Sequence, residues 1–462
     1  NRHNNRTRLL QNNRWIKHLP VNLVLYNSKV YVKGEIVEAG IAIDEGKIFR
    51  IAKEANLPAA AKKLNIRGCL ILPGLIDCHV HLRNQQLAYK EDFFTGTSAA
   101  AAGGVTLVLD MPNNKPITMD VQSLRERMKL AEKQTVVNVG FFSAFPENLN
   151  EIPAIVEEGA VAFKVFLSHK VGGVDIDDDI ALLQAFKMTE KKGVPVAVHA
   201  EDRGMLENTS KEMRQDGCDD VSAYVKVHSP EAGVKAVRRV IRLVEKSFSH
   251  VHFCHVSSAA ELTAIVRAKE RELPVTCEVT PHNLLLTFNH SKRYSNLALT
   301  NPPLRTEKDV EALWSAFKQG LIDILVSDHA PHAIEEKKVA SVWDAKSGIP
   351  GLETMLPLML TQMNKGQIKI ADIVKACSEK SSLIFHLKDR GSIVEGNWAD
   401  LVVVDLNQEY KIDSSKFYSK AKYSPFDGYK VKGKPIKTFV NGQIVFDEDS
   451  VVTKAGTGQV IR

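Results

Sequence analysis

Eight short apolar runs, each followed by a segment of helix length, constrain the fold of this chain more than any other feature. The runs lie at 69–81, 104–114, 135–145, 160–170, 193–202, 250–258, 273–282 and 322–332. Amphipathic helical stretches lie between them, for example 121–133, 179–192 and 232–246. Strands that alternate with helices form parallel sheets. Eight such units predict an α/β fold, a (β/α)8 TIM barrel, whose functional site lies at the carboxyl ends of the strands.

The two ends of the chain have a different pattern. Residues 21–70 and about 391–447 alternate apolar and polar positions between Gly and Asn turns, which is typical of antiparallel strands. We therefore expect a small composite β-sandwich domain formed by both termini. The predicted boundaries are 21–70 for its N-terminal part, 71–388 for the barrel, and 389–462 for its C-terminal part and tail. Residues 1–20, with five basic and no acidic residues, are predicted to be a disordered leader.

Charge and cysteine usage narrow the functional classes. Much of the net charge of +6 comes from the leader, and the nearly neutral remainder gives no sign of a nucleic-acid partner. No stretch approaches the ~18–20 apolar residues that span a bilayer, so no membrane partner is expected. The six cysteines form no CxxC pair, and we expect reduced thiols in a cytoplasmic protein rather than metal ligands. A homo-oligomer is compatible with the sequence.

Histidines and one aspartate gather where the predicted strands end. His79 and His81 are two positions apart, so they point to one face of their strand. Alone, this pair could be two surface imidazoles. His199, His255 and Asp328 follow at the ends of later strands, at the same rim of the barrel. Imidazole and carboxylate together suit Zn²⁺ and related ions, which predicts two metals. One would be bound by His79, His81 and Asp328, and the other by His199 and His255.

The bridge between two such cations needs an anion, and the fourth predicted strand contains no acidic residue. It contains Lys164, flanked by Phe163 and Val165. A charged lysine is costly to bury there, which leaves a neutral amine able to capture CO2 as a carbamate. The carbamate would then serve as the bridging carboxylate. A lysine that extends to the surface is the alternative, and spacing alone favours it.

Several motifs together resemble the type I-like dihydroorotases of the amidohydrolase superfamily. They are DCHVHLR, DMPNN, AFKVF, VHAED, HFCHVSS, CEVTPH, NPPLR, SDHAPH and SGIPGLETMLPL, and the resemblance covers roughly residues 22–447. The resemblance implies a barrel with two Zn²⁺ ions and a composite β-sandwich. It also implies that Lys164 is carboxylated (N6-carboxylysine) and bridges the metals. After Arg83 the chain has Asn-Gln-Gln where many bacterial relatives have Glu-Pro-Gly, so the resemblance does not determine the shape of that loop.

The residues next to the metal ligands indicate a carboxylate-bearing substrate. Arg83 shares the face of His81, and its guanidinium matches a carboxylate, while Asn113 offers further donors. The resemblance assigns both to the carboxylate of dihydroorotate. It also assigns Asn301 and His332 to the ring and carboxylate, and the backbone of 347–348 to closing the site. The alternatives are a rim salt bridge from Arg83 to Glu91 or Asp92, and turn roles for Asn113 and Asn301.

These predictions define a reaction. Two metals would lower the pKa of a shared water, and Asp328 would be the general base that transfers its proton to the leaving nitrogen. The predicted function is a dihydroorotase, which reversibly hydrolyses dihydroorotate to N-carbamoyl-L-aspartate in pyrimidine biosynthesis. One alternative is an allantoinase or hydantoinase-type cyclic amidohydrolase, whose substrates lack the ring carboxylate. The other is an inactive amidohydrolase-like scaffold, which the full set of ligands disfavours.

Three further histidines receive other roles. We predict that His252 packs outside the barrel because its parity is opposite to that of the site residues. His282 is expected to orient the site without being a required ligand. His329, next to Asp328 on the opposite parity, is expected to be structural.

Overall fold

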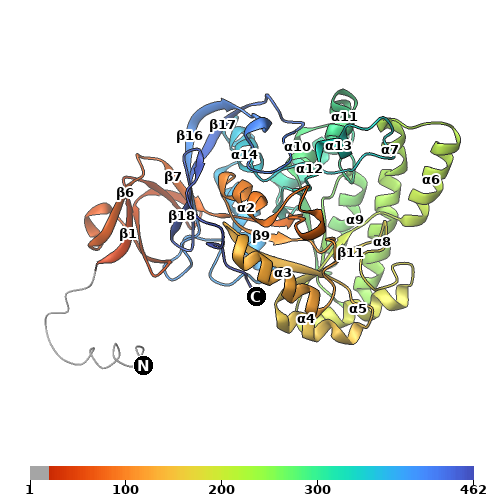
Figure 1. The fold of residues 1–462 in the computed structure, drawn as a ribbon, viewed down its shortest axis with the longest axis horizontal. Coiled ribbons are helices and arrows are strands. Elements are labelled where there is room, and N and C mark those ends of the chain that lie inside the picture. Colours follow the sequence, from red (N-terminus) through yellow and green to blue (C-terminus); the bar gives the residue numbers. More distant parts are fainter. Residues whose placement is uncertain (1–19) are drawn as a thin grey trace.

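The structure, a computed structural model, describes residues 20–462 and contains the predicted barrel (Figure 1). Its eight parallel strands are hydrogen-bonded in chain order. They are β8 (Leu75–Val80), β9 (Val105–Asp110), β10 (Asn138–Ala144), β11 (Ala160–Phe166), β12 (Val196–His199), β13 (Val251–Phe253), β14 (Val275–Val279) and β15 (Ile324–Leu325). A parallel bridge between Val80 and His329, just after β15, closes the ring. The (β/α)8 prediction is confirmed.

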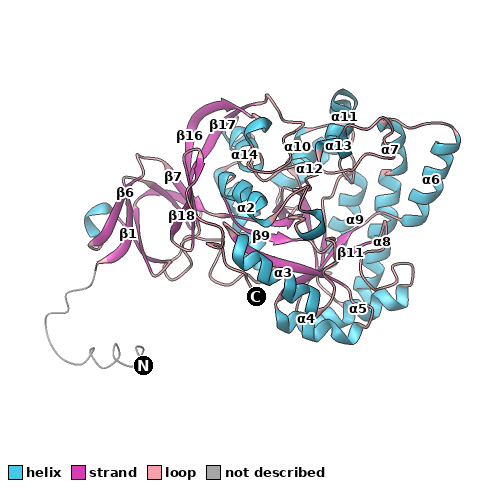
Figure 2. Cartoon of the chain, in the orientation of Figure 1, coloured by secondary structure: helices cyan, strands magenta, loops and turns pink. Residues whose placement is uncertain are grey.

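Helices surround this sheet (Figure 2). Those up to the sixth strand unit are α2 (Phe93–Ala102), α3 (Val121–Gln134), α4 (Ile152–Glu158), α5 (Asp179–Lys192), α6 (Arg203–Gln215), α7 (Val221–Val227), α8 (Pro230–Ser247) and α9 (Ala259–Glu270). They are followed by α10 (Pro281–Leu285), α11 (Phe288–Tyr294), α12 (Glu307–Lys318), α13 (Ile334–Lys337), α14 (Met355–Asn364), α15 (Ile370–Val374) and α16 (Lys380–Ile384). Hydrogen bonds from side chains determine where several helices begin. At the start of α9, for example, Ser258 and Glu261 form a reciprocal capping box.

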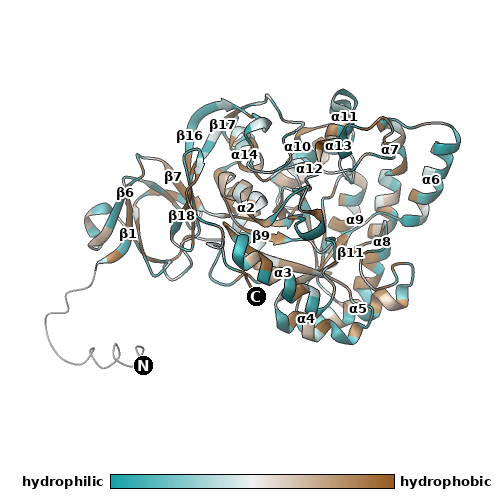
Figure 3. Cartoon of the chain, in the orientation of Figure 1, coloured by the Kyte–Doolittle hydropathy of each residue, from teal (hydrophilic) through white to brown (hydrophobic). Residues whose placement is uncertain are grey.

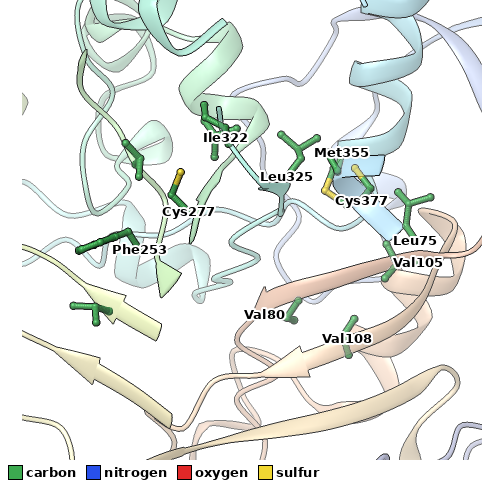
Figure 4. Close-up of a cluster of buried hydrophobic side chains, with 14 of the residues drawn as sticks. Leu75, Val80, Val105, Val108, Phe253, Cys277, Ile322, Leu325, Met355 and Cys377 are labelled. Carbon is green, nitrogen blue, oxygen red and sulfur yellow. The ribbon is translucent and has the colours of Figure 1, made fainter. Parts of the chain in front are cut away.

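Two apolar layers stabilise the barrel. The outer layer lies between strands and helices, where Leu75 and Val105 face Met355 and Cys377 (Figure 4). The inner layer fills the barrel with residues such as Ile76, Leu107, Phe142, Ala162 and Ile324. The helices carry both hydrophilic and hydrophobic positions, as α3 and α8 show in Figure 3, because one side of each faces the outer layer.

Strands from both ends of the chain build the composite β-sandwich. A four-stranded sheet has the order β5 (Lys47–Ala52), β4 (Gly40–Asp44), β1 (Val21–Tyr26) and β6 (Ala60–Asn65). A seven-stranded sheet has the order β19 (Ser450–Val451), β18 (Gln443–Asp447), β17 (Lys430–Val440), β16 (Leu401–Lys411), β7 (Leu70–Pro73), β2 (Lys29–Val32) and β3 (Glu35–Glu38). Leu25, Ile41, Ile71, Leu401 and Phe439 belong to one buried cluster of this domain. The disordered-leader prediction for 1–20 falls almost entirely outside the described residues.

The first apolar run, 69–81, is two strands rather than one. Its first half is β7, which pairs with β16 in the sandwich, and its second half is β8 of the barrel. Gly74 lies at the junction, where a Cβ atom would come within 2.2 Å of the Thr106 side chain. The run therefore joins the two domains directly.

The C-terminal region also reaches the barrel. The connection between β16 and β17, residues 412–429, packs on the barrel through a buried cluster that includes Leu304, Leu358 and Phe426. The last residues run along β10, where the amide of Val139 donates to Gln459 O at 2.9 Å and that of Ile461 donates to Val139 O at 2.8 Å. Within residues 20–462, no helix has the length and apolar character needed to cross a bilayer.

Candidate active site

The four predicted histidine ligands lie side by side at the carboxyl ends of the strands. Ring centroids are 5.4 Å apart for His81 and His79, 5.2 Å for His79 and His255, and 4.7 Å for His255 and His199. All four side chains are buried. Together with Lys164 and Asp328 they are called the histidine cluster below.

Asp328 completes one end of the histidine cluster. One of its carboxylate oxygens lies 3.5 Å from Nε2 of His79 and 3.5 Å from Nε2 of His81. These three side chains form a group whose ligand atoms all lie within 4.8 Å of one another. The backbone at Asp328 has a φ of 46°, a conformation that non-glycine residues adopt rarely. This strained turn directs the carboxylate toward the two imidazoles.

Three of the histidines are held by an acceptor on one ring nitrogen, and the other nitrogen faces a neighbouring residue of the cluster. His79 Nδ1 contacts Glu278, and His199 Nε2 lies 2.7 Å from Glu201. His81 Nδ1 lies 2.7 Å from Oδ1 of Asn113. Metal-binding histidines are typically oriented in this way. The residues therefore fit a metal site.

His255 supplies a further observation in favour of a cation. Its Nε2 lies 3.0 Å from Nδ1 of His199, and its Nδ1 is buried without a hydrogen-bond partner in the described part of the chain. Burial lowers the pKa of His255 well below its ordinary value, so the ring is neutral. A buried neutral imidazole with an unpaired nitrogen is suited to coordinate an ion.

Burial and neighbouring charges shift the pKa values of the cluster residues in different directions. Burial lowers the pKa of His81 to about 3. Burial and Lys164 also disfavour protonated His79, but the carboxylates of Glu278 and Asp328 outweigh them and raise its pKa to about 10. Burial alone would raise the pKa of Asp328, whereas the imidazoles of His79 and His81 lower it well below its usual range. Asp328 is therefore an anion among imidazoles.

Lys164 points into the barrel and not to the surface. The side chain is fully buried, with Nζ 3.5 Å from Nε2 of His79 and 2.9 Å from Sγ of Cys254. Among residues 20–462, no carboxylate oxygen lies within 4 Å of this nitrogen. Its placement next to His79 excludes the alternative of a surface lysine.

The prediction that His252 packs outside the barrel is wrong. In the parallel register Lys164 pairs with Ala197, and Ala197 pairs with His252, so all three face the interior. His252 Nε2 lies 2.9 Å from Oε2 of Glu278. The prediction assumed that side chains alternate between the two faces as far as His255. This alternation stops because β13 ends at Phe253 and His255 adopts a φ of 33°.

Sequence reasoning missed the carboxylates that hold the histidines. Glu278 contacts both His79 and His252, and it accepts a hydrogen bond from the amide of His255 at 3.0 Å. Glu201 lies between His199 and His228, with His228 Nδ1 at 2.9 Å. Both glutamates are buried at strand ends. An acidic residue inside an apolar run, as in VTCEV, was the available signal, because carboxylates are almost never buried without partners.

Arg83 and His332 lie together beside the cluster. Nη2 of Arg83 is 3.2 Å from Nε2 of His332, and Nε of Arg83 donates to Pro331 O at 3.2 Å. No carboxylate within residues 20–462 forms an ion pair with this buried arginine. Glu91 instead contacts Thr95, His329 and Ser419, and Asp92 pairs with Lys420 at 2.6 Å. The rim salt bridge that was the alternative for Arg83 does not form.

The two asparagines have unequal contacts. Oδ1 of Asn113 accepts from His81, and no acceptor among residues 20–462 contacts its amide nitrogen. Oδ1 of Asn301 is buried without a hydrogen-bond partner in the described residues. Next to Asn301, Leu299 O accepts from the amide of Gly348 at 2.8 Å. Gly348 has a φ of 138°, and a Cβ atom there would lie 2.3 Å from Ala330 O, so only glycine fits this close approach. Arg83, Asn113, Asn301 and His332 are called the polar rim below.

The loop that carries Arg83 is held by contacts from other elements. Arg83, Asn84 and Gln85 all have positive φ, at 54°, 56° and 47°. Asp110 accepts from the amide of Leu82 at 2.9 Å and from Nε of Arg127 at 2.6 Å. Arg127 also donates to Oε1 of Gln85 at 3.0 Å. These contacts form what we call the Arg127 clamp, which determines the loop in the absence of a Pro-Gly turn.

The other two histidines near the site have separate surroundings. Burial lowers the pKa of His282 to about 4, which keeps the ring neutral beside Asp328 and His79. Nε2 of His329 lies 3.3 Å from Oε2 of Glu91, and its Nδ1 accepts from the amide of Gly351 at 3.2 Å. His329 therefore connects two segments under the site.

Comparison with known proteins agrees with this geometry. The model of the amidohydrolase family matches residues 70–445, and the chain belongs to this family. A dihydroorotase of Methanothermobacter thermautotrophicus is 37% identical over 91% of this chain and 93% of that protein. A dihydroorotase of Wolbachia sp. subsp. Drosophila simulans is 37% identical over 92% of this chain and 93% of that protein.

A solved structure shares the fold over nearly the whole chain. The L-hydantoinase (dihydropyrimidinase) of Arthrobacter aurescens superimposes with a TM-score of 0.92 and is 31% identical, covering 96% of this chain and 99% of that one. This likeness extends over the barrel and the composite sandwich together. The fold of this chain is therefore shared by a protein named for a different substrate from that of its dihydroorotase relatives.

Proposed function

We propose that this protein is a metal-dependent dihydroorotase, which reversibly hydrolyses the ring amide of dihydroorotate to give N-carbamoyl-L-aspartate. The observation that carries the choice of substrate is Arg83, a buried guanidinium beside the histidine cluster with no carboxylate partner in the described chain. A buried charge without a counterion is unfavourable, and a carboxylate on the substrate would neutralise it. The dihydroorotase relatives support the same choice.

The histidine cluster would hold two divalent cations, for which we propose Zn²⁺. His79, His81 and Asp328 would bind one ion, and His199 and His255 the other. Lys164, carboxylated by CO2, would contribute to both, since its amine lies within the cluster and lacks an anionic partner. When bound, the ions would stabilise negative charge on the amide oxygen and make a water molecule more acidic.

Asp328 is the residue placed to move the proton. Its carboxylate lies 3.5 Å from Nε2 of His79 and 3.5 Å from Nε2 of His81. It would take a proton from the attacking water as the new carbon–oxygen bond forms. As the carbon–nitrogen bond of the ring breaks, it would return this proton to the leaving nitrogen. The reverse sequence closes the ring.

The polar rim would select and orient the substrate. Arg83 would bind the carboxylate, with the free amide nitrogen of Asn113 as a second donor. Asn301 would bind the ring through Oδ1, which is buried without a partner and can accept from a ring N–H. His332 lies next to Arg83 and contacts the 347–348 backbone, with its Nε2 3.0 Å from Ser347 O. The rim thus recognises both the charge and the amide edge of the ring.

The test is a parallel assay of purified protein, reconstituted with Zn²⁺ and bicarbonate, on dihydroorotate, allantoin and dihydrouracil. Turnover of dihydroorotate with kcat/KM at least about 100-fold above the two uncharged rings is expected from the loss of a charge-assisted contact. Turnover of allantoin or dihydrouracil alone would contradict the proposal. A hydantoinase-type activity is the second candidate, because the Arthrobacter protein of that name is 31% identical and shares the fold.

Metal analysis tests the remaining alternative, an inactive scaffold. About two equivalents of metal per chain are expected from the ligand set. Fewer than one equivalent after reconstitution would favour the scaffold. Reconstitution of the purified protein in 13C-bicarbonate buffer, followed by 13C NMR, should show one carbamate signal. This signal should be absent in Lys164→Ala.

A further inference from the structure

Lys90 is a buried cation that the proposed reaction does not use. It lies in the loop after β8 and is 7% exposed. Its Nζ is 2.9 Å from Oε1 of Glu336 and 3.1 Å from Nδ1 of His332. The Glu336 carboxylate also accepts from the hydroxyl of Tyr89 at 3.0 Å. Lys90 therefore stands directly behind the rim histidine, on the side away from Arg83.

The contacts of Lys90 determine which nitrogen of His332 carries the proton. A lysine ammonium has only donors, so its contact with Nδ1 of His332 is a hydrogen bond only if Nδ1 accepts, and Ser347 O, an acceptor, requires the same tautomer. The proton of the neutral ring is then on Nε2, which donates to Ser347 O at 3.0 Å. Burial, Arg83 and Lys90 lower the pKa of His332 far below its ordinary value, so the ring is neutral.

This tautomer affects Arg83. Nη2 of Arg83 lies 3.2 Å from Nε2 of His332, and this contact is a hydrogen bond only if Nε2 carries no proton. In the Nε2–H tautomer, which fits the contacts with Lys90 and Ser347 O, Arg83 does not donate to His332. The N–H groups on this side of Arg83 stay free for a ligand. In the opposite tautomer, Nδ1–H would point at Glu336, whose Oε2 is 3.5 Å away, and Nε2 would accept from Arg83. Arg83 would then lose a donor to the protein itself.

The charges around Lys90 agree with this arrangement. Arg83 and Lys90 are both positive, Glu336 is negative, and His332 is neutral. The group as a whole therefore carries one positive charge, which one carboxylate on a ligand would neutralise.

We propose that Lys90 is a specificity-determining positioning residue, which holds His332 as the Nε2–H tautomer and so keeps the donors of Arg83 free for the substrate carboxylate. This inference rests on the proposed function for the identity of the substrate, but not for the tautomer. Lys90 touches neither the reacting atoms nor the substrate, and it acts through His332.

The first experiment needs no variant. The protein is labelled with 15N-histidine, and the His332 signals are assigned by their absence in His332→Asn. The 15N shifts should show a protonated Nε2 and an unprotonated Nδ1. A protonated Nδ1 in the wild-type protein would overturn the proposal, whatever substrate the enzyme uses.

The second experiment compares Lys90→Met with Lys90→Arg and with Lys338→Met, which removes an exposed lysine next to α13. In Lys90→Met, the proton should move to Nδ1 and KM for dihydroorotate should rise about 10- to 100-fold, with kcat changed less than about threefold. Lys90→Arg should restore part of the affinity, and Lys338→Met should match the wild type.

The outcomes separate two failures. If wild-type protein does not hydrolyse dihydroorotate, the proposed function fails while the tautomer test still stands. If wild-type protein is active and folded Lys90→Met keeps the same KM and tautomer, the role of Lys90 is refuted.

Discussion

The histidine cluster and the polar rim are adjacent but are built in different ways. Most members of the cluster lie in or directly after barrel strands, such as His79 in β8, Lys164 in β11 and His199 at the end of β12. The members of the rim lie in loops. Arg83 depends on the Arg127 clamp, and His332 depends on Lys90 and on Ser347.

This difference shows which kind of contact positions each of the two regions. The closed sheet fixes the cluster, because β9 to β14 are each held by two neighbouring strands and the bridge between Val80 and His329 closes the ring. The rim relies on side-chain contacts between segments far apart in the chain, so its residues can change while the cluster stays constant. The high structural similarity to a hydantoinase agrees with such a division.

The largest effect should come from the cluster. Asp328→Asn keeps the shape but removes the proton acceptor, so kcat should fall about 10²- to 10⁴-fold. Steady-state assays on dihydroorotate measure this, with circular dichroism to check the fold. If Asp328→Asn retained full turnover, proton transfer would have to be assigned to another residue.

A change in the rim should affect binding more than chemistry. Arg83→Met removes the guanidinium, and KM for dihydroorotate should rise about 10- to 100-fold, the size of a lost hydrogen bond to a charged group. Metal content should be unchanged, which separates this variant from a loss in the cluster. An unaltered KM would make Arg83 structural and would remove the contrast between the two regions.

The Arg127 clamp should give a smaller effect of the same kind. Gln85→Ala removes one of the two acceptors of Arg127, with about 0.5–1.5 kcal/mol lost in stability and KM raised up to about tenfold. Gln85→Glu keeps an acceptor and adds a charge next to Arg127, so KM should stay near the wild-type value. Equal KM values for Gln85→Ala and wild type would show that Arg83 is positioned without the clamp.

The last prediction concerns the stability of the region around the rim and not its activity. Glu353 accepts from the amides of Tyr418 at 2.9 Å and Ser419 at 3.3 Å, in the segment that covers Glu91. Burial raises the pKa of Glu353 from 4.5 to about 8. The folded protein therefore binds this proton more tightly than the unfolded chain, and the free energy of unfolding should fall as pH rises from about 4.5 to 8.

Glu353→Gln should flatten this slope. Denaturant unfolding at several pH values measures it, with Glu35→Gln on the exposed strand β3 as the control. A slope that persists unchanged in Glu353→Gln would show that other groups cause it.

Much of the architecture could be predicted because its signal is local. Eight apolar runs with helices between them predict a barrel, and the positions of His79, His81 and His199 at strand ends follow from the two-residue period of a strand. That period fails where the backbone is irregular. His252 was assigned to the wrong face because the strand ends two residues before His255, whose φ is positive.

Contacts between distant segments could not be predicted from the sequence. Glu278 under His79, Arg127 next to Gln85 and Lys90 behind His332 join residues that no spacing rule connects. The sequence by itself determined the strands, the barrel and the residue types that can bind metal, because backbone periodicity acts over a few residues. Only the tertiary structure decided which carboxylate holds each imidazole and which donors stay free for a ligand. Burial and hydrogen bonding at these positions depend on segments that meet only when the chain has folded.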